Sequence, residues 1–351
     1  MQVSDVLDRY TKTGVLFEKL EENKVRCQAC AHRCLLLPGK RGICGVRFNQ
    51  EGDLQVPSGY VAGVNVDPIE KKPFNHFLPG RGVLTFGMLG CNFHCSFCQN
   101  WYTSQALREP QAASSVGQIM PTTARELVTM AVEHGAAAVA SSYNEPLISS
   151  EWAVEIFEEA KAKQLKTVMI SNGFATPETL KFLRPWLDGY KIDLKSMQEE
   201  RYKEMGGRLG PVLDSIRLAK ELGLWVEVVT LVIPGFNDSV DELWKMSEFL
   251  TSVSADIPWH VTAYHPDYLM NDAPPTPAAT LQRAAEVGEE AGLHFVYAGN
   301  LPGKVGSLED TYCPKCRTRL VQRRGYWIRE IAVTNEGKCP NCGQSIPGIW
   351  N

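Results

Sequence analysis

Apolar and polar residues alternate in blocks between residue 81 and about residue 300, in a pattern that predicts strands and helices in turn. Short apolar segments are typical of buried strands, and the segments between them carry apolar residues at helical spacing. We expect strands at 83–89, 137–141, 166–170, 190–194, 226–233, 260–264 and 294–297. Repeated strand–helix units imply a parallel sheet, and this number of units predicts an α/β fold with a full or partial (β/α) barrel.

Helix signals lie between these strands. Thr123 and Glu126 form a capping-box pattern, and Gly135 stands where that helix should end. The segment 151–163 carries a single apolar stripe at helical spacing. Proline suits the first turn of a helix, and further helices are predicted from Pro177, Pro211, Ser239 and Pro277.

The two flanks of this region have a different character. Residues 1–80 and 305–351 are irregular, rich in Gly and Pro, and each contain four cysteines. We therefore predict a Cys-rich N-terminal region over 1–80, a barrel over 81–304 and a zinc-ribbon-like module over 305–351. Small regions of this kind commonly depend on a metal, because they cannot bury a large core.

Composition narrows the class of protein. Of the 351 residues, 44% are hydrophobic, which is enough for a large core, and the net charge of −4 makes nucleic acid an unlikely partner. The chain has no apolar run of about 18 residues, so we expect no membrane span. The first residues include acids and lack an apolar core, unlike a signal peptide, so a cytoplasmic location is expected.

Cysteine is the residue type that points most directly to chemistry. The eleven cysteines fall into tight groups of four, three and four, with none left over. An odd total in such groups argues for bound metals rather than disulfides. It also indicates a reducing working environment, because exposed thiolates and clusters oxidise.

The central group is Cys91, Cys95 and Cys98, with the spacing C-x3-C-x2-C directly after the first predicted strand. A [4Fe–4S] cluster normally takes four Cys ligands, so three would leave one iron open to a small molecule. The alternatives are three unrelated core cysteines or a zinc site completed by His94 or a distant residue. Structural zinc prefers four protein ligands, which favours the cluster.

The C-terminal group consists of two C-x2-C pairs, Cys313 with Cys316 and Cys339 with Cys342. This spacing is typical of a four-cysteine zinc ribbon, although a rubredoxin-like single iron uses the same ligands. Basic residues are frequent around the pairs. They predict either a docking face for RNA or an acidic partner, or a solvated face, and we favour the second.

The N-terminal group is Cys27, Cys30, Cys34 and Cys44. Its spacing fits zinc and an auxiliary [4Fe–4S] cluster equally well, with His32 as a competing ligand. The run 42–45 resembles a zinc knuckle, which slightly favours zinc.

Polar residues follow five of the predicted strands, at 142–146, 171–173, 193–195, 234–238 and 264–267. Barrel strands meet at one mouth, so five such ends favour a binding site over ordinary turn chemistry. Asp193 and Lys195 face the same side of a strand, either as site residues or as a structural ion pair. Among the residues able to contact a substrate, His265 is the first candidate, ahead of Lys72, His76, Glu227 and His260.

The cysteine run, including the aromatic Phe97 before its third cysteine, resembles the motif of radical S-adenosylmethionine (SAM) enzymes. The resemblance implies that SAM chelates the open iron. It also implies that one electron, from a donor such as flavodoxin or ferredoxin, cleaves SAM to methionine and a 5′-deoxyadenosyl radical.

The later strand ends are similar to those of enzymes that activate glycyl-radical proteins. That likeness implies that the turn containing Asn144 and Glu145 holds the SAM amine, although Tyr143 and Asn144 replace two glycines of the family. It further implies that the SAM site is completed by Ser171, Asn172, Asp193 and Lys195.

A closer resemblance covers nearly the whole chain. The runs 39–47, 67–73, 98–101, 258–260 and 346–350 are similar to the radical SAM enzyme of the AmmeMemoRadiSam system. This resemblance implies the chemistry class and supplies no substrate. The first hypothesis is modification of a small molecule or of a companion protein of the same system, with Memo-like and AMMECR-like proteins as expected partners. The alternatives are glycyl-radical activation, RNA modification or, outside enzymes, a metal-stapled interaction module.

Overall fold

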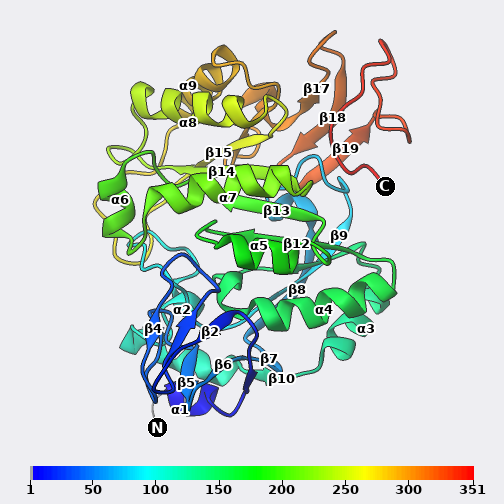
Figure 1. Ribbon diagram of the computed structural model, residues 1–351. Coiled ribbons are helices and arrows are strands. Elements are labelled where there is room, and N and C mark those ends of the chain that lie inside the picture. The colour runs from blue at the N-terminus through cyan, green and yellow to red at the C-terminus, as the bar shows by residue number, and fades with distance from the viewer. Residues whose placement is uncertain (1–2) are drawn as a thin grey trace.

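The computed structural model describes residues 3–351, and its centre is an eight-stranded sheet in the order β16-β15-β14-β13-β12-β11-β9-β8 (Figure 1). Neighbouring strands from β9 to β16 run parallel, and β8 (Gly63–Pro68) pairs antiparallel with β9. The parallel strands are β9 (Gly82–Gly87), β11 (Ala138–Ser141), β12 (Lys166–Ser171), β13 (Gly189–Asp193), β14 (Trp225–Val232), β15 (Trp259–Ala263) and β16 (Val296–Gly299). All seven predicted strands are confirmed, each within two residues at either end.

The sheet does not close into a barrel. Among residues 3–351, β16 pairs only with β15 and β8 pairs only with β9, so the two edges stay apart. The expectation of a full barrel is therefore wrong, and the partial barrel is what the chain forms. A closed (β/α) barrel needs eight parallel strands, whereas here seven are parallel and the eighth is antiparallel at one edge.

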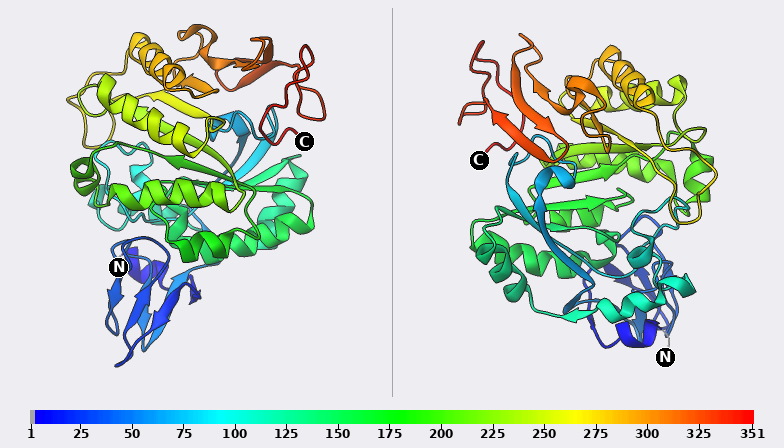
Figure 2. Two further views of the ribbon diagram at one scale, coloured as in Figure 1. Left: turned by 45° about the horizontal axis from the view of Figure 1, so that its top comes forward. Right: turned by 180° about the vertical axis from the view of Figure 1, so that it is seen from behind.

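The larger helices alternate with the parallel strands and cover the outer side of the sheet (Figures 1 and 2). They are α3 (Ala124–Glu133), α4 (Ser150–Ala162), α5 (Pro177–Leu183), α6 (Glu199–Glu204), α7 (Leu209–Glu221), α8 (Val240–Val253) and α9 (Ala278–Glu290). Shorter ones are α1 (Val3–Leu7), α2 (Trp101–Ser104), η1 (Ile69–Lys71), η2 (Pro110–Gln118), η3 (Pro146–Ser149) and η4 (Gly306–Glu309). None of the helices in this part of the chain is long and apolar enough to cross a membrane.

Most of the helix ends predicted from the sequence are found in the structure. Thr123 and Glu126 form a complete capping box, and Gly135 follows the helix with a φ of +66°. α5 begins at Pro177, and Ser239 and Pro277 are the N-cap residues of α8 and α9. Only α7 differs, because it begins two residues before Pro211, at Leu209.

The N-terminal flank is more regular than predicted. β1 (Thr11–Thr13), β6 (Asp53–Pro57) and β5 (Phe48–Gln50) form one small sheet, and β2 (Phe17–Lys19), β3 (Val25–Cys27) and β4 (Leu35–Leu36) form another. β7 (Tyr60–Val61) pairs with β10 (Met120–Pro121), and β8 already belongs to the central sheet. The central sheet therefore begins before residue 81.

The C-terminal flank is a three-stranded sheet of β17 (Thr311–Tyr312), β18 (Arg319–Arg324) and β19 (Trp327–Ile331). It lies on the opposite side of the central sheet from the N-terminal strands (Figures 1 and 2). Buried Arg323 fixes it by donating to the Asn75 carbonyl at 2.8 Å and to Thr311 Oγ1 at 2.7 Å.

A buried network beneath the sheet joins the C-terminal flank to the barrel. Burial lowers the pKa of His76 to about 4, so the ring is neutral; Nδ1 donates to the Pro347 carbonyl and Nε2 accepts from Tyr297. Glu227 accepts hydrogen bonds from the Asn75 and His76 backbones and binds the ring of His260 at 2.6 Å. His76, Glu227 and His260 thus contribute to packing, and none of them lines the central cavity.

A buried ion pair attaches the N-terminal flank to α4. Arg47 and Glu151 are 1% and 3% exposed, and the guanidinium binds both carboxylate oxygens, at 2.7 and 2.8 Å. The same carboxylate accepts from the Val15 and Leu16 backbones at 3.3 Å. Burial alone would raise the pKa of Glu151, but the charge of Arg47 and the hydrogen bonds to the carboxylate together outweigh burial and lower that pKa.

Removing the charge of Glu151 should therefore destabilise the fold. We expect Glu151→Gln to lower the free energy of unfolding at pH 7 by about 3–5 kcal/mol, because it leaves a buried guanidinium uncompensated. The difference from the parent should narrow as the pH falls below 4.5, the ordinary pKa of Glu, because the unfolded parent then binds a proton that the folded carboxylate, with its lowered pKa, does not yet bind. Urea unfolding followed by fluorescence measures both effects.

Glu159→Gln on the same helix is the matched control. Its carboxylate is 37% exposed and lies 4.0 Å from Arg125, which is 82% exposed. Such a pair contributes less than about 1 kcal/mol. If Glu151→Gln and Glu159→Gln lowered the free energy of unfolding by the same amount, the buried pair would not anchor the N-terminal flank.

Candidate functional site

The three central cysteines lie on one loop that follows β9 and lines a cavity at the C-terminal ends of the parallel strands. The cavity has a volume of about 410 Å³, within the range of small-molecule sites, and Cys91, Cys95 and Cys98 all contribute to its wall. Cys91 Sγ accepts from the Phe93 backbone at 3.3 Å, and Cys98 Sγ lies 3.3 Å from Ser104 Oγ. The sequence-predicted trio is therefore brought together at the C-terminal end of the first parallel strand.

Close packing fixes the outer side of this loop. A Cβ added to Gly207 would lie 2.3 Å from the ring of Phe93, and one added to Gly206 would lie 2.5 Å from the ring of His94. The His94 backbone also donates to the Met205 carbonyl at 3.0 Å. Among residues 3–351, His94 is in no group of three ligands close enough to share one ion, so a zinc site completed by His94 is not supported.

Burial makes these three thiols poor acids in the absence of a metal. It raises the pKa of Cys95 to about 12 and raises the pKa of Cys91 and Cys98 as well. A metal that binds here must therefore displace protons, and its positive charge then holds the thiolates.

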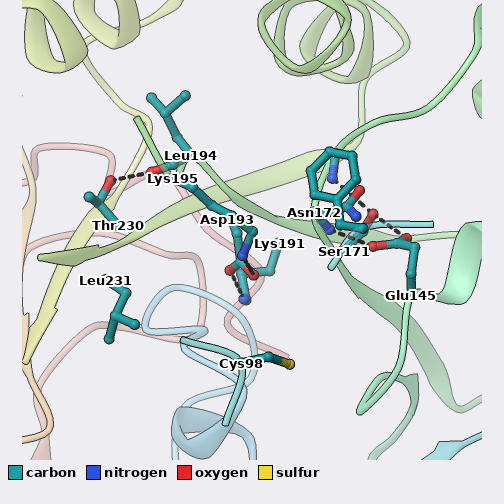
Figure 3. Close-up of polar contacts among 12 residues, drawn as sticks. Cys98, Glu145, Ser171, Asn172, Lys191, Asp193, Leu194, Lys195, Thr230 and Leu231 are labelled. Atoms are coloured by element: carbon teal, nitrogen blue, oxygen red, sulfur yellow. Dashed lines mark hydrogen bonds and ion pairs between the residues drawn. The ribbon is translucent and has the colours of Figure 1, made fainter. Parts of the chain in front are cut away.

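Glu145, Ser171 and Asn172 form a second part of the wall, where β11 and β12 end (Figure 3). Glu145 Oε1 accepts from Ser171 Oγ at 2.7 Å and from the Leu147 backbone at 3.0 Å, and Oε2 accepts from the Asn172 backbone at 2.7 Å. Burial raises the pKa of Glu145 to about 7 despite these donors. A cation bound beside it would favour the charged carboxylate.

The turn before Glu145 has a left-handed backbone conformation, which glycine usually adopts, at a residue that is not glycine. Tyr143 has a φ of +70°, in the left-handed region that few large residues adopt. Gly87 makes room for it, because a Cβ there would lie 2.7 Å from the Ser142 carbonyl oxygen. Asn144 Oδ1 accepts from the Met88 backbone at 3.1 Å, whereas its buried Nδ2 has no hydrogen-bond partner within residues 3–351.

A charged trio from β13 and the residues directly after it, called the β13 trio below, forms the third part of the wall (Figure 3). Asp193 pairs with Lys191 and, at 3.1 Å, with Lys195. Burial would raise the pKa of Asp193, but the two ammonium groups lower it to about 2. The trio thus carries one excess positive charge. Sequence reasoning missed Lys191, although the strand period of two places it on the face of Asp193 and Lys195.

The other predicted candidates lie at the rim or outside the cavity. His265 is exposed and lies 3.1 Å from Gln99, a cavity residue, but does not itself line the cavity. Its role in catalysis stays a prediction. Sequence reasoning also missed several other cavity residues, because segments outside the predicted strand ends supply them: Lys71, Asn300 and Tyr326.

The C-terminal cysteines form a compact ligand set. Their four Sγ atoms lie within 4.8 Å of one another, and Cys313–Cys342 and Cys316–Cys339 are each separated by 3.6 Å. A metal–sulfur bond of about 2.3 Å in tetrahedral geometry places sulfur atoms about 3.8 Å apart. The group therefore fits a single metal ion and offers no open ligand position to a substrate.

Comparison with known proteins identifies the family. The family model of the radical SAM superfamily matches residues 86–250. An uncharacterized protein of Methanocaldococcus jannaschii is 37% identical over 338 residues, covering 95% of this chain and 98% of that protein. The chain belongs to the radical SAM superfamily.

Two further proteins are similar to this chain at lower sequence identity. The pyruvate formate-lyase-activating enzyme of Staphylococcus epidermidis is 23% identical over 201 residues, covering 53% of this chain and 76% of that enzyme. A radical SAM methyltransferase from Sphaerobacter thermophilus has a TM-score of 0.49 at 16% identity, covering 66% of this chain and 71% of that one.

Membership of the superfamily implies a [4Fe–4S] cluster and SAM, and the cavity fits both. Three buried or half-buried thiols on one loop would supply ligands to the cluster. The unpartnered Asn144 Nδ2, the Glu145 carboxyl and the β13 trio offer a donor, an acid and an excess positive charge beside them. These complement the amine, carboxylate and hydroxyl groups of SAM.

Removing the positive charge of Lys195 should weaken SAM binding. Lys195→Met keeps the length of the side chain and leaves Asp193 paired with Lys191. A charge-assisted hydrogen bond contributes about 1.5–3 kcal/mol, so the SAM dissociation constant should rise about tenfold or more. Equilibrium dialysis of the iron-loaded protein with labelled SAM measures it. Lys203→Met, on the exposed side of α6, should leave the constant unchanged; unaltered binding in both variants would place SAM elsewhere.

Disrupting the C-terminal ligand set should release its metal. We expect Cys339→Ser to lose about one metal ion per chain and to expose 305–351 to protease, because the metal cross-links two separate turns. Iron bound by the central cysteines should remain. Metal analysis and limited proteolysis followed by mass spectrometry test this, and unchanged metal content with an intact flank would refute the assignment.

Proposed function

We propose that this chain is a radical SAM enzyme that abstracts hydrogen from a small-molecule or companion-protein substrate. The observation that carries the proposal is the convergence of three thiols, an acid–amide turn and a charged trio on one cavity wall. When bound, the cluster and SAM supply a 5′-deoxyadenosyl radical that removes a hydrogen atom from the substrate. A flavodoxin- or ferredoxin-class protein supplies the electron.

The cavity residues position SAM by complementary charge. Lys195, held by Asp193, attracts the SAM carboxylate, and Asp193 accepts from the ribose hydroxyls. Glu145 and the Asn144 amide face the amino-acid end of SAM. Apolar Phe97 and Leu231 in the same wall limit the access of water to the reacting carbon.

The substrate occupies the part of the cavity lined by the β8 side and the C-terminal flank. Lys72 is 5% exposed, pairs with Asp67 at 3.1 Å and lies 4.8 Å from the ring centre of Tyr143. Tyr326, from the turn between β18 and β19, and Asn300 complete this side. A substrate with both an aromatic or apolar part and an anionic group fits this lining.

Glycyl-radical activation is the second candidate. It is favoured by the similarity to the pyruvate formate-lyase-activating enzyme and by the strand ends at 144–146, 171–173 and 193–195. Such an enzyme needs room for a protein backbone segment at the cavity mouth. A glycyl-radical protein encoded beside this chain, and its activation in the presence of SAM, would favour this candidate over the first.

Membership of the AmmeMemoRadiSam system is a further part of the proposal. It rests on the sequence runs 39–47, 67–73 and 346–350. In this setting Memo-like and AMMECR-like proteins are the companions, as partners or as substrates. Co-purification of the tagged full chain with each companion, under anaerobic conditions, tests the association.

The enzymatic proposal predicts SAM cleavage that depends on the central cysteines. Anaerobically reconstituted and reduced protein should release 5′-deoxyadenosine from SAM. Replacing Cys91, Cys95 and Cys98 together by Ala should abolish the release. These three are the cysteines in the cavity wall, so the variant has no thiolates there to hold the cluster. Chromatography of the product over time is the measurement, with circular dichroism to confirm folding.

Glu158→Ala, on the exposed face of α4, is the control and should cleave SAM at the parent rate. If the triple variant released 5′-deoxyadenosine at the parent rate, the radical SAM proposal would be wrong. Absence of release from the folded, iron-loaded parent would instead favour a metal-stapled interaction module.

A further inference from the structure

The four N-terminal cysteines gather at the base of the N-terminal flank, where it meets the barrel. Cys27 ends β3, and Cys30 bridges to Ala175 beside the barrel strand β12. Cys27, Cys30 and Cys44 are buried and Cys34 is half-buried. The thiol groups of Cys27 and Cys44 each raise the pKa of Cys30, after burial, so the sulfur atoms lie close enough to interact.

The spacing of these sulfur atoms differs from that of a zinc site. Within residues 3–351 the C-terminal cysteines form the one group whose ligand atoms all lie within 4.8 Å of one another. No three of the N-terminal sulfur atoms all lie within 4.8 Å of one another. The sulfur atoms of Cys91, Cys95 and Cys98 do not either. Tetrahedral zinc requires sulfur atoms about 3.8 Å apart, whereas a four-iron cube holds its cysteines farther apart. The wider spacing disfavours the zinc suggested by the knuckle-like run 42–45.

Asn92 connects this group directly to the central cysteine loop. The residue is fully buried and next to Cys91, and its Oδ1 accepts from Asn172 at 2.8 Å and lies 3.8 Å from Cys91 Sγ. Its Nδ2 has no hydrogen-bond partner in the described chain and lies on the side of Cys30, whose pKa the Asn92 amide lowers. The Asn92 carbonyl binds His32 Nε2 at 3.0 Å.

Two more contacts complete the junction. A Cβ on Gly90 would lie 3.2 Å from the Cys44 carbonyl oxygen, so the backbones of the two cysteine loops touch. Arg47, buried beside Cys27 and Cys44, has an Nε–H without a partner among residues 3–351. Two buried N–H groups that lack a hydrogen-bond partner of good geometry among residues 3–351, those of Asn92 and Arg47, therefore lie next to the cysteine group.

We propose that Cys27, Cys30, Cys34 and Cys44 hold a second [4Fe–4S] cluster, and that this cluster is the entry point for the electron that SAM cleavage consumes. The cluster sulfur atoms accept the orphaned hydrogen bonds of Asn92 and Arg47, which stabilise its negative charge. The cluster site is assigned independently of the reaction. Its role as the electron entry rests on the proposed function.

The electron balance is simple. A reduced flavodoxin- or ferredoxin-class protein loses one electron, the N-terminal cluster gains it, and it then passes to the central site. No bond forms or breaks and no proton is transferred. The short path through Cys30, Asn92 and Cys91 keeps the two sites in contact, while the N-terminal flank, which protrudes from the barrel in Figure 2, gives a donor protein a surface to approach.

Iron analysis of a variant without the central ligands tests the cluster. The full chain with Cys91, Cys95 and Cys98 all replaced by Ala should still bind about four irons and sulfides after anaerobic reconstitution, against about eight for the parent. Reduction should give the electron paramagnetic resonance signal of a single [4Fe–4S]⁺ cluster. Adding Cys34→Ser should remove both iron and signal, whereas adding Ser104→Ala should remove neither.

Each outcome of that test is decisive. Zinc in place of iron at the N-terminal site of the triple variant, counted beyond the one metal ion of the C-terminal cysteines, would overturn the proposal, as would no metal at the N-terminal site while the chain stays folded. If the triple variant does not fold, the parent with Cys34→Ser alone serves, since a fall from eight to four irons supports the cluster and an unchanged count overturns it. None of these readouts depends on SAM chemistry.

A comparison of reductants tests the electron entry. In Cys34→Ser, dithionite should still reduce the central cluster to the parent extent, but reduction by flavodoxin or ferredoxin should slow at least tenfold. Asn92→Leu, compared with the parent at equal iron content, should slow reduction by the protein donor and not reduction by dithionite. Equal reduction of parent and variants by the protein donor would refute the entry role while leaving the cluster itself in place.

Discussion

The loop from Met88 to Cys98 contains no helix or strand, so its shape depends on hydrogen bonds from the rest of the chain. Asn144 binds the Met88 backbone, Asn172 binds the Asn92 side chain, and the Met205 carbonyl binds the His94 backbone. Each of these partners follows a different element of the barrel. The three thiols can share one metal cluster only because these separate contacts hold the loop in one arrangement.

The charged residues of the cavity are also held by contacts within the protein, because a buried charge needs a partner before any ligand binds. Asp193 lies between Lys191 and Lys195, and Glu145 is satisfied by three donors. The cavity is therefore preorganised, and a zwitterionic ligand meets charges that are already in place. The remaining unpartnered donor, Asn144 Nδ2, marks where a ligand can add a contact at little cost.

The two flanks do different work although each contains four cysteines. The C-terminal sheet is tied beneath the barrel by Arg323 and the His76 network, and it also brings Tyr326 to the cavity. The N-terminal flank is tied to α4 by Arg47 and Glu151 and to the central loop by His32 and Asn92. One flank thus reaches the cavity through Tyr326, and the other reaches the central cysteine loop through His32.

The sequence by itself determined the seven parallel strands, the capping box at Thr123 and the division of the cysteines into three groups. These depend on local patterns, namely apolar periodicity, side-chain caps and ligand spacing, which neighbouring residues settle among themselves. The tertiary structure alone decided that β8 closes one edge as an antiparallel strand and that the barrel stays open. It also decided the sulfur spacing at the N-terminus and brought Lys191, Asn92 and Tyr326 to their places. Those features arise from contacts between segments far apart in the chain. The packing energy of such contacts depends on both segments together, so no short stretch of sequence predicts them.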